Sequence, residues 1–245
     1  MSRLLAIGVI GLLFTASQAA EAPRTVDRIV ADYMAARGGL SKIRAVQTLR
    51  QKGHAFGSAG RQAIVVRELK RPGKIRFEFT VQGMTGVYVA DNGAGWRVSP
   101  LDGSLEPTAL SEQAAADAME QADFDGPLVD WKAKGHRIEL AGQETIEGRM
   151  ADKLAITLAD GSVRHDFLDA TTHLLLRSEV TRRIKGHDVR VQMTFGDYKK
   201  TAGVMFPRKV EVGAIGRPQT LRVVVDSVEV NPPIKDARFT RPATP

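Results

Sequence analysis

The sequence predicts a single α+β domain, in which a few helical segments accompany a large, curved antiparallel sheet. Apolar and polar residues alternate along most of the chain, as they do in strands with one covered and one solvated face. Turn signals such as Asp91-Asn92-Gly93 and Asp160-Gly161 separate these runs at hairpin spacing. Helical segments are expected only near the start of the chain and at about residues 108–131, the one long break in the series of strands.

The first 20 residues have the form of a cleavable secretory signal. A basic Arg3 precedes an apolar run from Leu4 to about Ala16, and small residues end the segment at Ala20. The run is shorter than the ~20 apolar residues of a membrane span, which favours a signal peptide over an uncleaved anchor. We therefore expect export to the periplasm and one soluble domain over residues 21–245.

The chain is basic, with 35 Lys and Arg against 28 Asp and Glu, and it contains no cysteine. No disulfide can therefore staple the fold, and a hydrophobic core of ordinary size must stabilise it. Basic charge can indicate nucleic acid binding, but export and the lack of basic blocks argue against that partner. An anionic membrane surface or an acidic partner is the better candidate, and we expect a monomer.

Residues 25–37 are predicted to form an amphipathic helix. Thr25 is a plausible N-cap, and Gly38-Gly39 ends the helix. A short second turn follows, in which Leu40, Ile43 and Val46 fall together. The first helix has one apolar stripe at helical spacing, made of Val26, Ile29, Val30, Tyr33 and Met34.

The period then changes to two, and the apolar positions predict strands. Clear examples are residues 74–82, with Ile75, Phe77, Phe79 and Val81 on one face, residues 188–198, with Val189, Val191, Met193 and Phe195, and residues 153–160, with Leu154, Ile156 and Leu158. Further predicted strands are residues 49–56, 63–69, 86–90, 96–99, 136–141, 162–168, 174–181, 204–212 and 221–230. In the last strand the alternation changes parity between Val225 and Val228, which indicates a bulge.

An acidic segment interrupts this series of strands. Between Val98 and Trp131 there is no Lys or Arg, although the chain as a whole is basic. A helix rich in alanine is predicted to start at Pro107 or Thr108, and Gly126-Pro127 indicates a bend near its end. The sequence does not name the partners of the acids in this segment, which are Asp102, Glu106, Glu112, Asp117, Glu120, Asp123, Asp125 and Asp130.

The motifs of common catalytic and metal sites are not found. No two histidines are spaced as in His-Glu-x-x-His, there is no cysteine nucleophile, and there is no Gly-x-Ser-x-Gly elbow. The glycines of NGAGWR, from Asn92, are typical of a hairpin turn and do not form a nucleotide-binding loop. We therefore predict no catalytic residue, no metal and no cofactor, and we expect that the protein is not an enzyme.

Four stretches, taken in order, carry a resemblance to a known family. They are ADYMAARGGLSKIRAVQTLRQKG, GQETIEGRMADKLAITLADG, FGDYKKTAGVMFPRKVEV and VEVNPPIKDARFTRP, and the similarity spans about residues 26–242. Their order resembles the outer membrane lipoprotein-sorting proteins, a branch of the periplasmic lipoprotein-carrier (Lol-type) superfamily. The resemblance implies an unclosed β-barrel, helices that cover its open side, and a hydrophobic cavity that binds acyl chains without catalysis.

The resemblance also implies a function and its partners. The expected function is a periplasmic carrier of lipids or lipoproteins, with an inner-membrane transporter or an outer-membrane acceptor as possible partners. The alternative is a signalling or envelope-stress module that binds a lipid or a protein, and a third reading is a hydrolase or isomerase. In the carriers an arginine near the cavity holds a helical lid closed, and Arg67 is the candidate for that role here.

We predict that residues 108–131 form the lid, with Leu128 and Trp131 as its apolar anchors. Alanine-rich helices bury little area, so such a lid would be easy to displace. The alternatives are a fixed surface helix for this segment and an ordinary filled core for the apolar residues. The candidates for the cavity lining are Val66, Phe77, Phe79, Trp96, Leu128, Trp131, Ile156, Met193 and Phe195.

Overall fold

A computed structural model describes residues 24–184 and 186–242, so the predicted signal peptide lies outside the described residues. The described chain forms one antiparallel sheet with the strand order β6-β5-β4-β3-β2-β1-β13-β12-β11-β10-β9-β8-β7. The strands are β1 (Thr48–Gly57), β2 (Gln62–Lys70), β3 (Lys74–Val81), β4 (Met84–Asp91), β5 (Ala94–Ser99), β6 (Ser104–Ala109), β7 (Arg137–Ile146), β8 (Arg149–Thr157), β9 (Val163–Asp169), β10 (Leu175–Ile184), β11 (His187–Thr201), β12 (Val204–Ala214) and β13 (Leu221–Val230).

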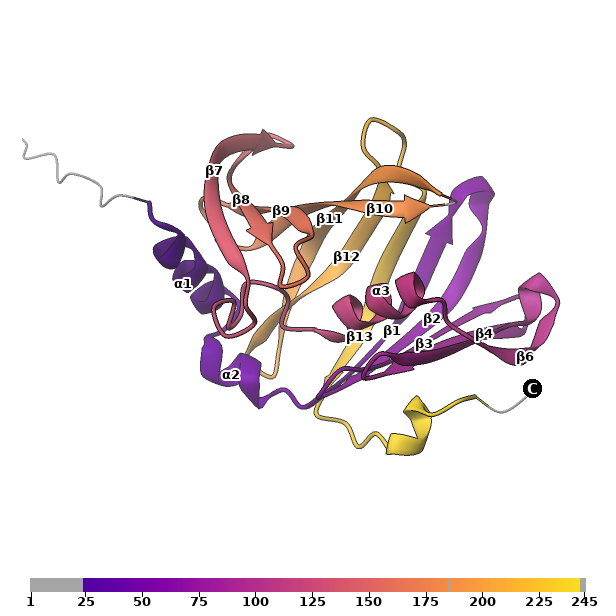
Figure 1. Cartoon of the computed structure of the whole chain (residues 1–245). Helices are drawn as coiled ribbons and strands as arrows, with labels where there is room; N and C mark the ends of the chain where they lie inside the picture. The colour runs from indigo at the N-terminus through magenta and orange to yellow at the C-terminus, as the bar shows by residue number, and fades with distance from the viewer. Residues whose placement is uncertain (1–23, 185, 243–245) are drawn as a thin grey trace, which may run out of the picture.

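The sheet is curved but not closed, because its two edge strands, β6 and β7, do not pair with each other. Figure 1 shows that the sheet curls around the helix α3 (Glu112–Ala122), which lies across its open side, while α1 (Val26–Ala36) and α2 (Leu40–Ala45) lie at one end. We call the face that α3 contacts the inner face and the opposite one the outer face. The predicted α+β fold with an unclosed barrel is therefore confirmed.

The first helix forms where its apolar stripe predicts. The Thr25 side chain accepts a hydrogen bond from the backbone N–H of Arg28, as an N-cap should. The helix buries Ile29, Val30 and Tyr33 against the inner face of β7, β8 and β9. It therefore covers the inner face of one edge of the sheet.

The outer face of β3, β4 and β5 is covered by the end of the chain. The turn η3 (Asp236–Phe239) buries Phe239 against Val89 of β4, with Trp96 of β5 packed beside them. Arg238 bonds to Glu68 and Glu78 from the same side. The outer face thus has its own small apolar cluster, separate from the one beneath α3.

Two details of the acidic segment differ from the prediction. Residues 104–109 form the edge strand β6, in which Thr108 and Ala109 pair with Arg97 and Trp96 of β5. The helix begins only at Glu112, where the Ser111 side chain accepts a hydrogen bond from the backbone N–H of Ala114. The predicted start at Pro107 or Thr108 was wrong because strand pairing to β5 outweighs the weak local preference for helix.

The predicted bulge in the last strand is confirmed. Lys52 of β1 pairs with Ser227 of β13, but the next residue, Gly53, pairs with Val225, so Asp226 is the extra residue. At this point the two backbones approach closely. A Cβ atom on Gly53 would lie 2.0 Å from the carbonyl oxygen of Val224. Glycine is therefore required at position 53 by the space beside the bulge.

We predict that Gly53→Ala lowers the free energy of unfolding by about 2–3 kcal/mol, because the added methyl group forces the two backbones apart. Urea denaturation measures this loss. The control is Gly196→Ala in β11, where no atom lies within 4 Å of the added Cβ. This control should be neutral or stabilise by roughly 0.4–1 kcal/mol. Equal effects of the two substitutions would contradict the steric explanation.

Candidate ligand-binding trough

The helices cover only one end of the inner face. At that end, Leu49, Leu69, Ile75, Phe206 and Val228 are buried in one cluster with residues of α2 and α3. Toward the other end of the same strands, most of the large inner side chains are only partly buried, although Val65 between them is buried. We call this uncovered apolar strip the trough, and its residues are Phe77, Phe79, Val81, Val191, Met193, Phe195, Val210, Val212, Val223 and Val225.

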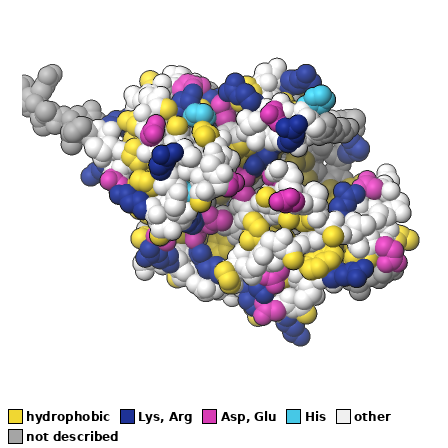
Figure 2. All heavy atoms as spheres, in the orientation of Figure 1, with side chains coloured by type: hydrophobic (Ala, Val, Ile, Leu, Met, Phe, Trp, Pro, Cys, Tyr) yellow, Lys and Arg dark blue, Asp and Glu magenta, His cyan; other side chains and the backbone are white. Residues whose placement is uncertain are grey.

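The trough follows from strand register and from alternation. Val223 pairs with Val210, and Val210 pairs with Phe195, so β13, β12 and β11 present their apolar side chains on one face. On the other side, the rings of Phe77 and Phe79 lie 6.2 Å apart. Figure 2 shows that this face of the molecule is hollowed, between the lobe that contains β4 and β6 and the ends of β10 and β11. The geometry provides an open, apolar wall for a flexible chain.

The helix α3 contributes little apolar area to its own attachment. The side chains that it buries completely are those of Ala118 and Ala122, which have one methyl group each. At about 25 cal/mol per Å², two such groups stabilise the docking of a helix only weakly. Polar contacts supply the rest, and one of them is the hydrogen bond that Tyr88 donates to the carbonyl of Ala114, at 2.9 Å.

Two acids of α3 form ion pairs with arginines on the inner face. Glu120 accepts hydrogen bonds from Arg164, at 2.9 Å, and from Arg182. Asp117 also lies 3.5 Å from Arg182. The Arg164 guanidinium is buried, and it also bonds to Asp166 at 2.9–3.0 Å. Burial lowers the pKa of Arg164, but Asp166 and Glu120 outweigh burial and raise it, so this arginine remains charged.

The segment that follows α3 is held much more firmly. Asp125 is buried and accepts two hydrogen bonds from Arg71, at 2.6 and 2.7 Å. The Arg71 guanidinium lies over the Phe124 ring, 4.6 Å from its centre. Leu128 and Val129 are buried in the two main clusters, and Asp130 pairs with Arg44. The hydrophobic anchors of the acidic segment therefore fix its end, and α3 is the part that polar contacts hold.

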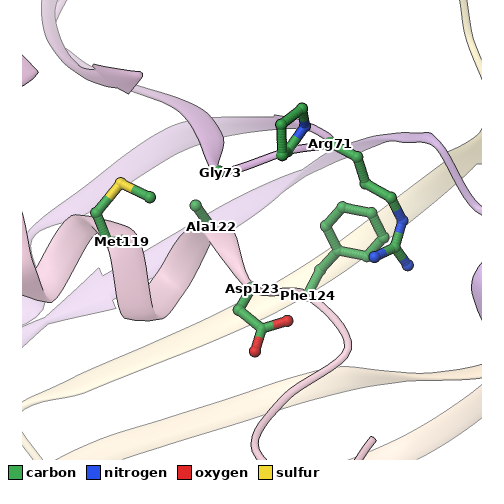
Figure 3. Close-up of a pocket in the computed structure, with 7 residues that line it drawn as sticks. Arg71, Gly73, Met119, Ala122, Asp123 and Phe124 are labelled. Carbon is green, nitrogen blue, oxygen red and sulfur yellow. The ribbon is translucent and has the colours of Figure 1, made fainter. Parts of the chain in front are cut away.

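A small pocket marks the junction between α3 and this fixed end. Its volume is about 260 Å³. Figure 3 shows Arg71 and Phe124 together on one side of the pocket, and Met119 at some distance from them on α3. The pocket is too small for an acyl chain of full length, and it lies where α3 meets the segment that follows it. Its lining residues are Arg71, Pro72, Gly73, Met119, Ala122, Asp123 and Phe124.

Arg67 lies on the inner face beside α3. Its guanidinium donates a hydrogen bond to the carbonyl of Gln121, in the last turn of α3, at 2.5 Å, and a longer one to Gln51 at 3.4 Å. Its Nε atom is buried and has no hydrogen-bond partner among the residues that the structure describes. Burial lowers the pKa of Arg67 to about 10. The contact of Arg67 with α3 therefore requires the partial desolvation of its charged guanidinium group.

The structure separates the predicted lining residues into three groups. Phe77, Phe79, Met193 and Phe195 lie in the trough. Leu128, Ile156 and, at its edge, Trp131 belong to the cluster beneath α1. Trp96 lies in the outer cluster with Phe239, and Val66 alternates with the inward Val65 and Arg67 and therefore faces outward.

Some residues of the trough, and a contact near it, were not among the candidates. Val210, Val212, Val223 and Val225 extend its wall, and the alternation within β12 and β13 could have indicated them. The ion pair of Glu120 with Arg164 has no sequence signal, because the two residues are 44 positions apart.

We predict that Glu120→Gln increases hydrogen exchange of the α3 amides by roughly tenfold, because a partly buried ion pair is lost and tenfold corresponds to about 1.4 kcal/mol. Mass spectrometry after exchange in D₂O measures this change, and the amides of α1 should keep their protection. The control is Glu139→Gln, an exposed acid of β7, which should leave α3 unchanged. Unaltered exchange of α3 in Glu120→Gln would show that the ion pairs do not hold the helix.

Scans of the sequence against known protein families and against curated proteins give no match. Solved structures with a similar fold are found. A putative outer membrane lipoprotein-sorting protein domain from Vibrio parahaemolyticus is 11% identical with a TM-score of 0.58, and covers 88% of this chain and 97% of its own. A LolA superfamily protein from Nitrosomonas europaea is 12% identical with a TM-score of 0.58, and covers 89% and 99%.

A DUF1329 family protein from Desulfovibrio piger is similar to the same degree, with 14% identity, a TM-score of 0.58, and coverage of 88% of this chain and 97% of that one. The comparisons confirm the sequence resemblance at the level of the fold: the chain has the fold of the lipoprotein-sorting and LolA superfamily domains.

Within the described residues, none of the helices is both long enough and apolar enough to cross a membrane.

Proposed function

We propose that the protein is a non-catalytic periplasmic carrier that holds the acyl chains of a lipid or a lipoprotein in the trough, with α3 as a movable cover. The observation that carries this proposal is the uneven burial of the inner face. Large apolar side chains remain partly exposed toward one end of strands whose other end contributes to a buried core. The name of one similar structure, a putative outer membrane lipoprotein-sorting protein domain, supports the same class of ligand.

The energetics of an acyl chain explain why a cover is useful. Burial of hydrocarbon is worth ~0.8 kcal/mol per CH₂, so one long chain costs roughly 10 kcal/mol to expose to water. A carrier must offset most of this cost and still release its cargo. A helix whose buried side chains are alanines can move aside at a small cost in apolar contacts, while its ion pairs return it to one position.

The proposed carrier explains the two halves of the acidic segment. The end at Phe124, Leu128 and Val129 is anchored in the core and serves as the fixed point. The helix before it is held by Glu120, by Tyr88 and by Arg67, through polar contacts of which several are partly buried. Movement of the cover would therefore break polar contacts that water can replace, and it would remove only the two alanine side chains of Ala118 and Ala122 from the core.

We predict that Met193→Glu weakens the binding of a fluorescent fatty acid at least tenfold, because a carboxylate in the trough must be desolvated beside the acyl chain. Fluorescence titration of the purified protein measures the affinity. The matched control is Met150→Glu, an exposed methionine of β8 that lies away from the trough, and its affinity should equal that of the unmodified protein. No binding by the unmodified protein, or equal binding by both variants, would contradict the proposed function.

We predict that Arg67→Met speeds the release of the bound fatty acid, by roughly fivefold to tenfold, because α3 loses its hydrogen bond at Gln121. Stopped-flow displacement measures the rate. The free energy of unfolding should stay the same or rise, since a buried cation with an unpaired Nε atom is removed. The control is Arg97→Met, which removes an exposed arginine of β5. Slower release from Arg67→Met would count against its contact with the cover.

A further inference from the structure

The hairpin turns at the uncovered end of the trough form a continuous rim. Strand register makes them neighbours: Gly57, where β1 ends, pairs with Leu221, where β13 begins, and Leu221 also pairs with Val212 near the end of β12. The next hairpins along the sheet, β10–β11 and β3–β4, flank this centre. Figure 1 shows the β1–β2 hairpin and the end of β10 at the upper right of the sheet, and the β12–β13 hairpin at its top. We define the rim as residues 56–64, 80–85, 183–184, 186–190 and 214–222.

The rim concentrates exposed apolar side chains. Nine large hydrophobic residues are exposed in the described chain, and four of them lie in the rim, one at each hairpin. They are Ile64, Met84, Ile184 and Leu221, with exposures of 56%, 42%, 46% and 38%. Single exposed apolar residues need no explanation. Their recurrence at each of these four neighbouring hairpins calls for an explanation, because that arrangement presents them to one flat partner.

The rim is also strongly basic. The whole chain has 35 basic residues against 28 acidic ones, but the described residues of the rim carry five arginines and one acid, Asp188. That acid lies 3.6 Å from Arg183, with both side chains 66% exposed, so water weakens the pair. The rim therefore holds much of the positive excess of the chain. The arginines are Arg61, Arg183, Arg190, Arg217 and Arg222.

A cleft within the rim adds a place for a polar group. It has a volume of about 430 Å³ and lies between the start of β11 and the turn after β12. Its lining residues are Asp188, Val189, Arg190, Ala214, Ile215 and Arg217, and Arg190 also donates a hydrogen bond to Glu179 of β10 at 3.3 Å. Guanidinium groups bind phosphate oxygens well, and the neighbouring apolar side chains suit the glycerol region of a lipid.

We propose that the rim docks on the surface of an anionic lipid bilayer, with the exposed apolar residues in the interface and the arginines on the lipid phosphates. Basic residues beside apolar side chains are the combination that binds such an interface. Docking in this direction places the open end of the trough against the bilayer. An acyl chain can then move between bilayer and trough without crossing water. This inference goes beyond the carriage of a ligand, because it states where loading or unloading takes place.

The test is co-sedimentation of the full chain with vesicles of phosphatidylcholine, with and without phosphatidylglycerol. We expect binding to the anionic vesicles only, and loss of that binding at ~1 M salt, where the Debye length is ~3 Å. Each arginine near the surface should strengthen binding about fivefold. Arg61→Glu combined with Arg217→Glu should therefore weaken it at least tenfold, and Ile64→Ser combined with Ile184→Ser should weaken it severalfold.

Matched controls lie away from the rim. Lys235→Glu changes an exposed cation near the C-terminus, and Leu140→Ser changes an exposed apolar residue of β7. Neither substitution should alter vesicle binding. All variants should bind a fluorescent fatty acid as the unmodified protein does, which separates the rim from the trough and confirms folding. Three results would overturn the proposal: no vesicle binding, equal binding to neutral vesicles, or rim variants that bind as well as the controls. Of these, no vesicle binding would favour an acidic protein partner.

Discussion

The structure depends on one constraint: the inner face of the sheet is larger than the helices that cover it. Three short helices bury the inner side chains at one end of the strands, where Leu49, Leu69 and Phe206 lie in a common core. The same alternation continues along β3, β11, β12 and β13 beyond that core. Successive side chains of a strand point to opposite faces of the sheet, so the apolar side chains stay on the inner face along the whole strand. An uncovered apolar trough is the consequence.

The acidic segment in a basic protein is explained by the same constraint. A helix that must lie over an apolar face and still move cannot depend on large buried side chains. In α3 the buried positions are Ala118 and Ala122, and Glu120 reaches Arg164 and Arg182 on the sheet. Beyond the helix, Asp125 and Asp130 pair with Arg71 and Arg44 near the start of the sheet. Glu120, Asp125 and Asp130 thus form ion pairs with arginines that come from distant parts of the chain.

Most strands could be predicted because their apolar residues alternate. Alternation did not predict the strand β6, and it did not tell which predicted lining residues face the trough. The strand β6 contains Pro107 and exposes Leu105, since an edge strand has no core to face on both sides. Alternation identifies two faces without telling which one is inner. Phe77 and Met193 therefore lie in the trough, whereas Trp96, with an equally apolar pattern, packs on the outer face against Phe239.

The most direct test of the account is whether α3 moves when a chain enters the trough. The protein contains no cysteine, so Ala116→Cys on α3 and Thr181→Cys on β10, both exposed, can carry a pair of spin labels. Their distance distribution, measured by pulsed electron resonance, should be narrow without ligand and should shift to longer distances when a fatty acid binds. Tight binding with an unchanged distribution would contradict the movable cover, and the trough would then have to admit its ligand past a fixed helix.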